Sequence, residues 1–315
     1  MIPDPTGLSS NAKTLVGHRN PVQQRSKINE ANSTLAAGVE PNSEVNIVNQ
    51  EISGSRMIGV TRASHVFFAV VLIGLGILGL IKGDFAAGWS PAPESLPGRE
   101  ALAYLCDTVY LACGVGLLLR RTTTLAACVL FGYLLLWLLL LRLPWMVVEP
   151  QVGTWWPVCS TAVILASAWV LYSWLAGDLD RQHLRFVTDD KGVRIASTLF
   201  GLGLIPIGLA HFLYLDATAP LVPGWMQWPV FWSYFTGAAF IVAGVAVVIG
   251  VYARLAAALT AVQIGLLTLL VWVPVVVAGS PTTFQWNEFV VSILLTACAW
   301  VVADSYRGTP WLKRR

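Results

Sequence analysis

Apolar residues along this chain are gathered into long runs, and polar residues are concentrated before and between those runs. Eight runs are each long enough for a helix of about 20 residues, which is the length that crosses the hydrocarbon core of a bilayer. Proline, glycine and charged residues interrupt the pattern between them. The runs cover residues 60–82, 100–119, 122–147, 156–176, 193–213, 229–250, 253–278 and 286–305. The pattern therefore predicts an all-α integral membrane protein with eight transmembrane helices.

Composition supports this reading and excludes other classes of protein. Of the 315 residues, 56% are hydrophobic and 12% are charged, whereas soluble domains carry roughly a quarter charged residues. A soluble enzyme and a small disulfide-stabilised module are therefore excluded. The formal net charge of +3 is too small and too scattered for a phosphate-binding surface, so we expect no nucleic-acid partner. The expected partner is a lipid bilayer, and we expect a multi-pass protein of the cell membrane, the inner membrane if the source is bacterial.

The segment 1–58 is the exception, because it is rich in Ser, Asn, Pro, Gly and Gln and poor in aromatic residues. Such a segment buries too little apolar surface to offset the loss of chain entropy, so we predict that it is disordered. It has no apolar core of the kind that a cleaved secretory signal needs, so we expect the first transmembrane helix to stay uncleaved.

Basic residues predict the orientation, because loops that stay in the cytosol carry an excess of Lys and Arg. Both chain ends and alternate loops are basic here, so we expect both termini in the cytosol. The basic positions are Arg56, Arg62, Arg120, Arg121, Arg181, Arg185, Lys191, Arg194, Arg254, Arg307, Lys313, Arg314 and Arg315. The opposite ends of the helices carry tryptophans, which suit the headgroup zone or would roof an outward-facing cavity. These are Trp89, Trp145, Trp155, Trp156, Trp225, Trp228, Trp232, Trp272 and Trp286.

The two halves of the apolar region repeat each other. Trp156 matches Trp286, and the sequence Leu-Ala-Ala after the second span of each half matches as well, at 125–127 and 255–257. Because each half has four spans, an even number, the pattern predicts two parallel four-helix bundles related by an axis along the membrane normal. The predicted divisions are a cytosolic tail 1–58, a first repeat 59–177, a cytosolic linker 178–192, a second repeat 193–306 and a basic cytosolic tail 307–315.

At these residues the chain resembles a known family. The second half carries Ala210-His211-Phe212, Val222-Pro223-Gly224-Trp225, Thr236-Gly237 and Arg254-Leu255-Ala256-Ala257, and with them it resembles the DoxX-like family of four-span membrane proteins. The first half resembles a diverged copy of the second half. The family takes its name from a subunit of a thiosulfate:quinone oxidoreductase. The resemblance therefore implies a quinone cofactor and a protein partner in an oxidoreductase complex. Many members carry a Glu shortly after the Thr-Gly, where this chain has Phe240, and Tyr110 in the first half.

Ionisable residues inside the spans are the candidates for chemistry, because a charge at mid-bilayer costs roughly 2.5–3.5 kcal/mol on insertion scales. Asp107 is placed on the order of 10 Å inside the outer boundary by the helical rise per residue. We expect it to bind a neighbouring helix through Arg142, or to handle protons or a ligand. Arg142, near the outer end of the third span, would otherwise extend to the interface.

Three further residues lie near the predicted outer ends of spans. His211 would carry a proton, bond to a quinone carbonyl or cap the carbonyls at a helix end. Asp84 is its partner in the repeat. Glu288 is expected to begin the last span, with Asn287 as its cap, where a negative charge favours the helix N-terminus.

The function therefore stays open between three classes. In the first, the protein is the membrane subunit of a quinone-linked oxidoreductase, with Asp107, Arg142, Asp84 and His211 lining an outward-facing site. In the second it transports a small molecule or lipid through the cleft between the repeats, and in the third it is a scaffold that recruits a soluble partner. The five cysteines lie singly within apolar runs and no His lies at ligand spacing from them, so we predict neither a metal site nor a redox pair.

Overall fold

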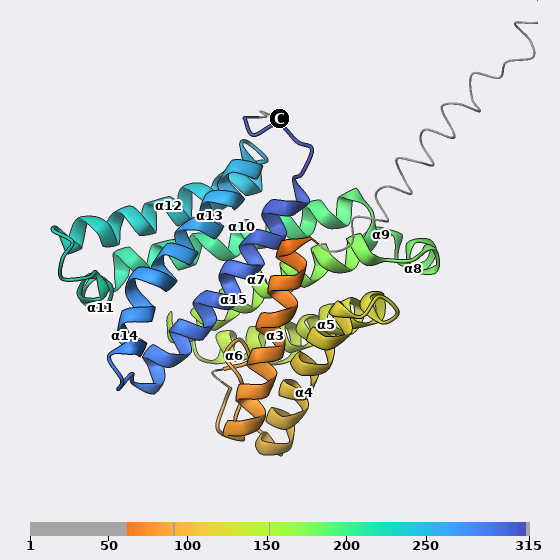
Figure 1. Cartoon of the computed structure of the whole chain (residues 1–315), viewed down its shortest axis with the longest axis horizontal. Coiled ribbons are helices and arrows are strands. Elements are labelled where there is room, and N and C mark those ends of the chain that lie inside the picture. Colours follow the sequence, from red (N-terminus) through yellow and green to blue (C-terminus); the bar gives the residue numbers. More distant parts are fainter. Residues whose placement is uncertain (1–61, 91, 151, 313–315) are drawn as a thin grey trace, which may run out of the picture. The chain divides into compact units, whose positions relative to one another are not determined.

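The computed structural model describes residues 62–90, 92–150 and 152–312, and over these residues the chain is all-helical, with no strand (Figure 1). Eight helices are long and apolar enough to span a membrane, which confirms the predicted number of spans. Predicted and observed ends agree within a few residues. The long helices are α3 (Ala63–Lys82), α4 (Arg99–Leu118), α5 (Thr123–Trp137), α7 (Val152–Leu175), α10 (Asp190–Leu213), α12 (Pro229–Ile249), α13 (Ala253–Leu267) and α15 (Thr283–Ser305).

Two of these helices continue through a short π-helical segment. Helix α5 passes through η1 (Leu138–Arg142) into α6 (Leu143–Val148), and α13 passes through η3 (Thr268–Trp272) into α14 (Val273–Val277). In both cases a proline, Pro144 or Pro274, is the second residue after the π-helical segment. A π-turn inserts one residue into the helix and changes which side chains face the interior beyond it. The segments η1 and η3 lie 130 positions apart in the sequence.

The long helices pack in chain order within each half. In the first half α3 contacts α4, α4 contacts α5 and α5 contacts α7; in the second half α10 contacts α12, α12 contacts α13 and α13 contacts α15. The halves meet where α7 contacts α10, where α15 contacts α3, and where α7 and α15 contact each other. Helices α7 and α15 are therefore central, and they are also the two most buried spans, at 78% and 56%.

Glycines allow the closest of these helix contacts. A methyl group on Gly201 of α10 would lie 2.7 Å from the carbonyl oxygen of Gly244 on α12, and one on Gly208 would lie 2.5 Å from that of Gly237. Backbones approach this closely only where the side chain is absent, as in other membrane helix pairs. Gly201 and Gly208 therefore serve the packing of α10 on α12, whereas Gly83 ends α3 in the left-handed conformation, with φ of 66°.

The last span begins earlier than the sequence suggested. Helix α15 starts at Thr283, and Thr282 is its cap: the Thr282 hydroxyl accepts from the Gln285 amide at 3.2 Å, and the Gln285 side chain accepts from the Thr282 amide at 2.9 Å. This reciprocal pair satisfies two amide groups at the helix start. The prediction that Asn287 caps the helix and that Glu288 begins it is therefore wrong, because Glu288 lies more than one turn inside α15.

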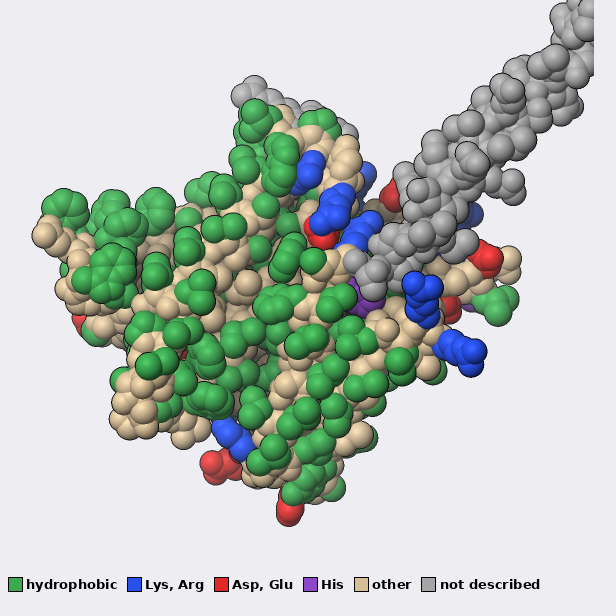
Figure 2. All heavy atoms as spheres, viewed as in Figure 1, with side chains coloured by type: hydrophobic (Ala, Val, Ile, Leu, Met, Phe, Trp, Pro, Cys, Tyr) green, Lys and Arg blue, Asp and Glu red, His purple; other side chains and the backbone are tan. Residues whose placement is uncertain are grey.

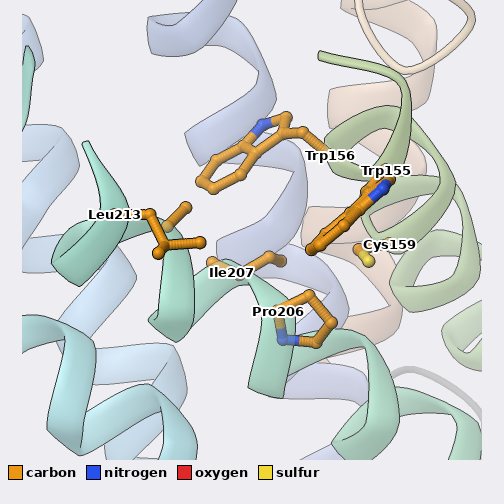
Figure 3. Close-up of a pocket in the computed structure, with 7 residues that line it drawn as sticks. Trp155, Trp156, Cys159, Pro206, Ile207 and Leu213 are labelled. Atoms are coloured by element: carbon orange, nitrogen blue, oxygen red, sulfur yellow. The ribbon is translucent and has the colours of Figure 1, made fainter. Parts of the chain in front are cut away.

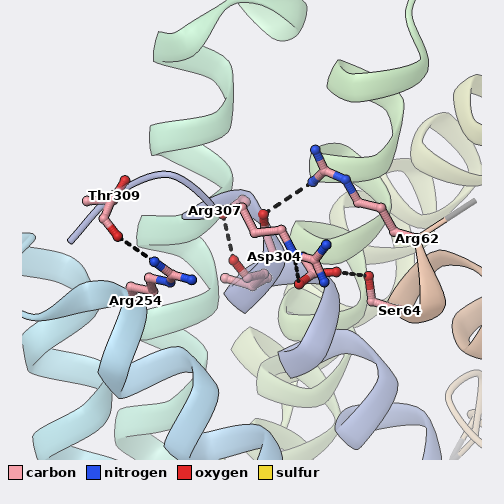
Figure 4. A network of polar contacts seen from close by, with 8 residues as sticks. Arg62, Ser64, Arg254, Asp304, Arg307 and Thr309 are labelled. Carbon is pink, nitrogen blue, oxygen red and sulfur yellow. Dashed lines mark hydrogen bonds and ion pairs between the residues drawn. The ribbon is translucent and has the colours of Figure 1, made fainter. Parts of the chain in front are cut away.

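A polar network joins the start of α3 to the end of α15 (Figure 4). The buried Asp304 carboxylate accepts from the Ser64 hydroxyl and pairs with Arg307 at 2.8 Å, and Arg62 donates to the Asp304 carbonyl at 3.2 Å. The start of α3 and the end of α15 therefore lie on the same side of the helix bundle, as an even number of spans requires. That this side is cytosolic stays a prediction from the Lys and Arg distribution.

The segments between the halves and at the ends differ in how far they are described. The predicted linker 178–192 holds two short helices, α8 (Asp178–His183) and α9 (Arg185–Thr188), and its last residues already belong to α10. The loop before α12 holds α11 (Leu215–Thr218) and a 3-10 turn, η2 (Ala219–Leu221). The predicted tail 1–58 lies outside the described residues. Figure 2 shows hydrophobic side chains over most of the visible face of the described part, with most of the Lys and Arg gathered toward the end where α15 finishes.

Candidate functional site

The turn 84–90, between α3 and α4, folds into the interior of the first half. Phe85, Ala86, Ala87 and Trp89 are all buried, and Trp89 is completely shielded from solvent. Non-helical backbone inside a membrane protein is tolerated only where protein groups satisfy its hydrogen bonds. The ionisable side chains that satisfy this turn come from α4 and η1.

Asp107 and Arg142 hold the two ends of this turn. The Asp107 Oδ1 atom accepts from the Ala86 amide at 3.0 Å, and Arg142 Nη2 donates to the carbonyl oxygens of Trp89 and Ser90 at 2.6 and 2.9 Å. Both side chains are buried, at 0% and 2% exposure. Arg142 therefore points into the protein. The alternative expectation, that its side chain extends to the membrane interface, is wrong.

The structure records no ion pair between Asp107 and Arg142, although it describes both residues. The interhelical tie expected for Asp107 is instead made to the backbone of the turn. Its second oxygen, Oδ2, faces Gly79 of α3, where any side chain would overlap the carboxylate, and it has no hydrogen-bond partner among the described residues. One oxygen of this buried carboxyl group is thus hydrogen-bonded to the turn, and the other is packed against Gly79.

Aromatic rings enclose the same turn. Trp89 stacks on Tyr110 with ring centroids 4.3 Å apart and makes edge contacts with Tyr133 and Trp137 at 5.6 and 5.2 Å. The Arg142 guanidinium lies 6.0 Å from the Trp137 ring, within the range of a cation–π contact. Trp89 was expected either in the headgroup zone or as part of the roof of an outward-facing cavity, whereas the turn carries it into the core, where it is completely buried.

A small pocket with about 20 Å³ of free space lies between α3 and α15, against the outer surface of this turn. We call it the α3–α15 pocket. Leu75, Leu78 and Val290 give it an apolar floor, and Phe85, Trp286, Lys82 and Asn287 add two rings and two hydrogen-bond donors. Lys82 Nζ lies 5.5 Å from the Trp286 ring centroid.

Asp107 lies directly behind the wall of the α3–α15 pocket. Gly79 and Ala86 both line the pocket, and both lie against the Asp107 carboxylate. Gly79 leaves room for the carboxylate because it has no side chain, and the Ala86 amide donates a hydrogen bond to it. The pocket is therefore an apolar cleft with two donors at its surface and a buried carboxyl group one residue layer away. Sequence reasoning missed Lys82, Trp286 and Asn287 as members of a single site, because they come from helices about 200 positions apart.

A second small pocket, with about 10 Å³ of free space, lies between α7 and α10 (Figure 3). We call it the α7–α10 pocket. Trp155, Trp156 and Cys159 line it from α7, and Pro206, Ile207, Ala210 and Leu213 line it from α10. Trp155, Trp156 and Trp286 thus line pockets between helices.

The remaining predicted site residues lie apart from the buried carboxyl group. Asp84 is half exposed and forms an ion pair with Arg99 at 2.9 Å. His211 belongs to α10, where its Nδ1 donates to the Ile207 carbonyl at 3.0 Å, one helical turn earlier, and its ring lies 5.8 Å from that of Phe240. This bond agrees with the expectation that His211 binds a backbone carbonyl near the end of its helix. Glu288 is half-buried, and no described residue donates a hydrogen bond to its carboxylate.

No group of three or more His, Cys, Asp or Glu side chains suited to a metal ion occurs in the described part of the chain. All five cysteines are free thiols. No family model, no curated protein and no solved structure matches the chain. The resemblance to the DoxX-like family therefore stays a prediction.

Proposed function

We propose that the chain is a DoxX-like membrane protein of two four-helix repeats and that its α3–α15 pocket binds a quinone, as in the membrane subunit of a quinone-linked oxidoreductase. The observation that carries the proposal is the combination of an apolar pocket between membrane-spanning helices, two hydrogen-bond donors at its surface and the Asp107 carboxyl group behind its wall. Small-molecule sites are commonly apolar clefts with a few placed polar groups.

The repeat is supported by features that recur at nearly constant spacing. The π-helical segments η1 and η3 lie 130 positions apart and each is followed by a proline. The helix contacts are also reciprocal, because the last long helix of each half, α7 or α15, packs on the first long helix of the other half. A twofold axis along the membrane normal would relate both pairs.

A quinone fits the chemistry of the pocket at three points. Its flat ring would lie against Phe85 and Trp286, and its two carbonyl oxygens would accept hydrogen bonds from the Lys82 ammonium and the Asn287 amide. Its apolar chain would extend toward the surrounding lipid. Reduction of a quinone takes up protons, and Asp107 is a carboxyl group placed to hand a proton toward the pocket. The electrons would come from a partner subunit of the complex.

The test is a binding titration of a short-chain quinone with the purified protein in phospholipid nanodiscs. Trp286→Ala removes a ring from the α3–α15 pocket, and Trp156→Ala removes its counterpart from the α7–α10 pocket. We expect the first variant to weaken quinone binding about tenfold, the effect of roughly 1.4 kcal/mol of lost aromatic contact, and the second to leave it unchanged. Equal affinities in the wild type and in Trp286→Ala, or no binding at all, would contradict the proposal.

A second candidate function is transport of a lipophilic molecule along the contacts between the halves. The observation that favours it is that both pockets lie between a first and a last long helix of different halves, rather than inside either half. Transport predicts flux of the quinone across liposomes that contain the protein, whereas an electron-transfer subunit predicts binding without flux. The same two tryptophan variants would show which contact carries the flux.

A further inference from the structure

Two arginines that are far apart in the sequence meet at one buried aspartate, on the side of the bundle where α3 begins and α15 ends (Figure 4). Arg307 pairs with the Asp304 carboxylate at 2.8 Å, and Arg62 donates to the Asp304 backbone carbonyl at 3.2 Å. We call Arg62, Arg307 and Asp304 the arginine cluster. It brings together the residue before the first long helix and the end of the last one.

The arginine cluster carries more positive than negative charge. Asp304 supplies one negative charge against two guanidinium groups, and both of its carboxylate oxygens are in use, Oδ1 by Arg307 and Oδ2 by the Ser64 hydroxyl. Burial lowers the pKa of Arg62, the Asp304 charge raises this pKa, and the Arg307 charge lowers it. The two guanidinium groups are thus close enough to repel each other, and a bound anion would offset that repulsion.

Further contacts hold both arginine side chains of the cluster in place. The Arg62 guanidinium lies 4.2 Å from the centroid of the Trp174 ring. The segment after α15 is held against the start of α13, because Arg254 donates to the Thr309 carbonyl at 2.7 Å and its guanidinium lies 4.0 Å from the Trp311 ring. A site that is already held in shape loses less conformational freedom when a ligand binds.

The arginine cluster keeps donors for a ligand and is open to one. A guanidinium group carries five N–H donors, and the contacts above use one of them in Arg62 and one in Arg307. The Arg307 side chain is 55% exposed. The cluster lies directly beyond the ends of α3 and α15, which are both apolar enough to span a membrane, so it lies at the level of the lipid headgroups. Most of the Lys and Arg on the visible face gather at this end (Figure 2).

We infer that the arginine cluster binds the phosphate group of an anionic phospholipid. Guanidinium groups form paired hydrogen bonds with phosphate oxygens, and basic clusters beside membrane-spanning helices attract anionic lipids. The rings of Trp174 and Trp311 suit the same headgroup zone. The cationic group of a zwitterionic lipid would instead bring a further positive charge to the cluster. Because Lys82 and the α3–α15 pocket are at the opposite end of α3, this inference does not depend on the proposed quinone site.

The test is native mass spectrometry of the purified protein in detergent, titrated with dioctanoyl phosphatidylglycerol or dioctanoyl phosphatidylcholine. We expect phosphatidylglycerol to bind about tenfold more tightly, a difference of about 1.4 kcal/mol. Arg62→Gln and Arg307→Gln should each remove most of this preference. Arg120→Gln is the matched control, because it removes an exposed arginine from the turn between α4 and α5, on the same side of the bundle, and should leave the preference unchanged.

Asp304→Asn separates lipid binding from a loss of structure. It removes the negative charge of the cluster but keeps an acceptor oxygen for Ser64, so it should tighten phosphatidylglycerol binding about fivefold, which misfolded protein would not do. Equal affinity for the two lipids, an unchanged preference in both arginine variants, or weaker phosphatidylglycerol binding in Asp304→Asn would overturn the inference. Displacement of phosphatidylglycerol by an equal concentration of inorganic phosphate would overturn it as well, because the cluster would then be a site for free phosphate.

Discussion

Replacing Gly79 with alanine is the sharpest test of the geometry around Asp107. The added methyl group would overlap the Asp107 carboxylate, which is fully buried and cannot move into solvent. Relieving the overlap by moving the carboxylate would break its 3.0 Å bond with the Ala86 amide. The change therefore attacks the packing of α3 on α4 and the anchor of the turn 84–90 at the same time.

The expected loss of stability can be set from these two effects. Overpacking a filled interior costs about 1–3 kcal/mol. Loss of a hydrogen bond to a charged group costs about 1.5–3 kcal/mol. Alanine gains about 1 kcal/mol over glycine within a helix, which offsets part of the loss. We therefore expect Gly79→Ala to lower the free energy of unfolding by about 2–5 kcal/mol.

The chain offers a matched control on the same helix. Gly74 has no atom within 4 Å of the position where a methyl group would be added, so Gly74→Ala should keep the full helix-propensity gain and lose nothing. Unfolding of both variants is followed by circular dichroism in mixed micelles with increasing denaturing detergent. A double-mutant cycle with Asp107→Ala completes the assay, because removing the carboxylate should make Gly79→Ala nearly neutral. Equal stability of the two glycine variants, or no rescue by Asp107→Ala, would refute the placement of Asp107 against Gly79.

Three further predictions follow from the polar contacts. Arg142→Met removes the donor to the Trp89 carbonyl and should speed hydrogen exchange of the turn 84–90, measured by mass spectrometry, while exchange in α12 stays unchanged. Asp304→Ala leaves the Ser64 hydroxyl without its acceptor and should lower the free energy of unfolding by about 1–3 kcal/mol. Asp304→Asn keeps an acceptor oxygen and should therefore lose less stability. Thr282→Ala removes the cap of α15 and should cost about 1 kcal/mol in the same unfolding assay, which Thr282→Ser should largely avoid.

The all-helical class and the number of spans were predictable because their signals are local. Each span is a run of apolar residues whose length is set by the bilayer, and its ends carry residues that stop helices, such as Gly83 and Gly250 in the left-handed conformation. The start of α15 was placed too late because Asn287 was chosen as its cap rather than Thr282, although Thr282 and Gln285 form a recognisable capping pair. A search for that pair would have found the start of α15.

The site was only partly predictable because its contacts are not local. Asp107 and Arg142 were identified from the cost of burying charge, which depends on composition alone. Their partners were not, because the backbone groups they bind lie 21 and 53 positions away, in a turn that carries no periodic pattern. The pairing of Lys82 with Trp286 depends on which helices of the two halves meet, and no single-sequence signal reports this.

The proposed repeat makes the distribution of polar residues meaningful. At a spacing of 130, Asp107 corresponds to Gly237, Tyr110 to Phe240 and Arg142 to Trp272, and at a spacing of 128 Lys82 corresponds to Ala210. These four polar groups of the first half thus correspond to apolar or missing side chains in the second half, whereas Asp84 corresponds to the polar His211. Buried polar groups are expensive in a membrane, so two copies that served packing alone would both be expected to lose them. Asp107, Tyr110 and Arg142 are all buried around one turn of the first half, so we expect substitutions there to affect the proposed chemistry more than substitutions at the corresponding positions of the second half.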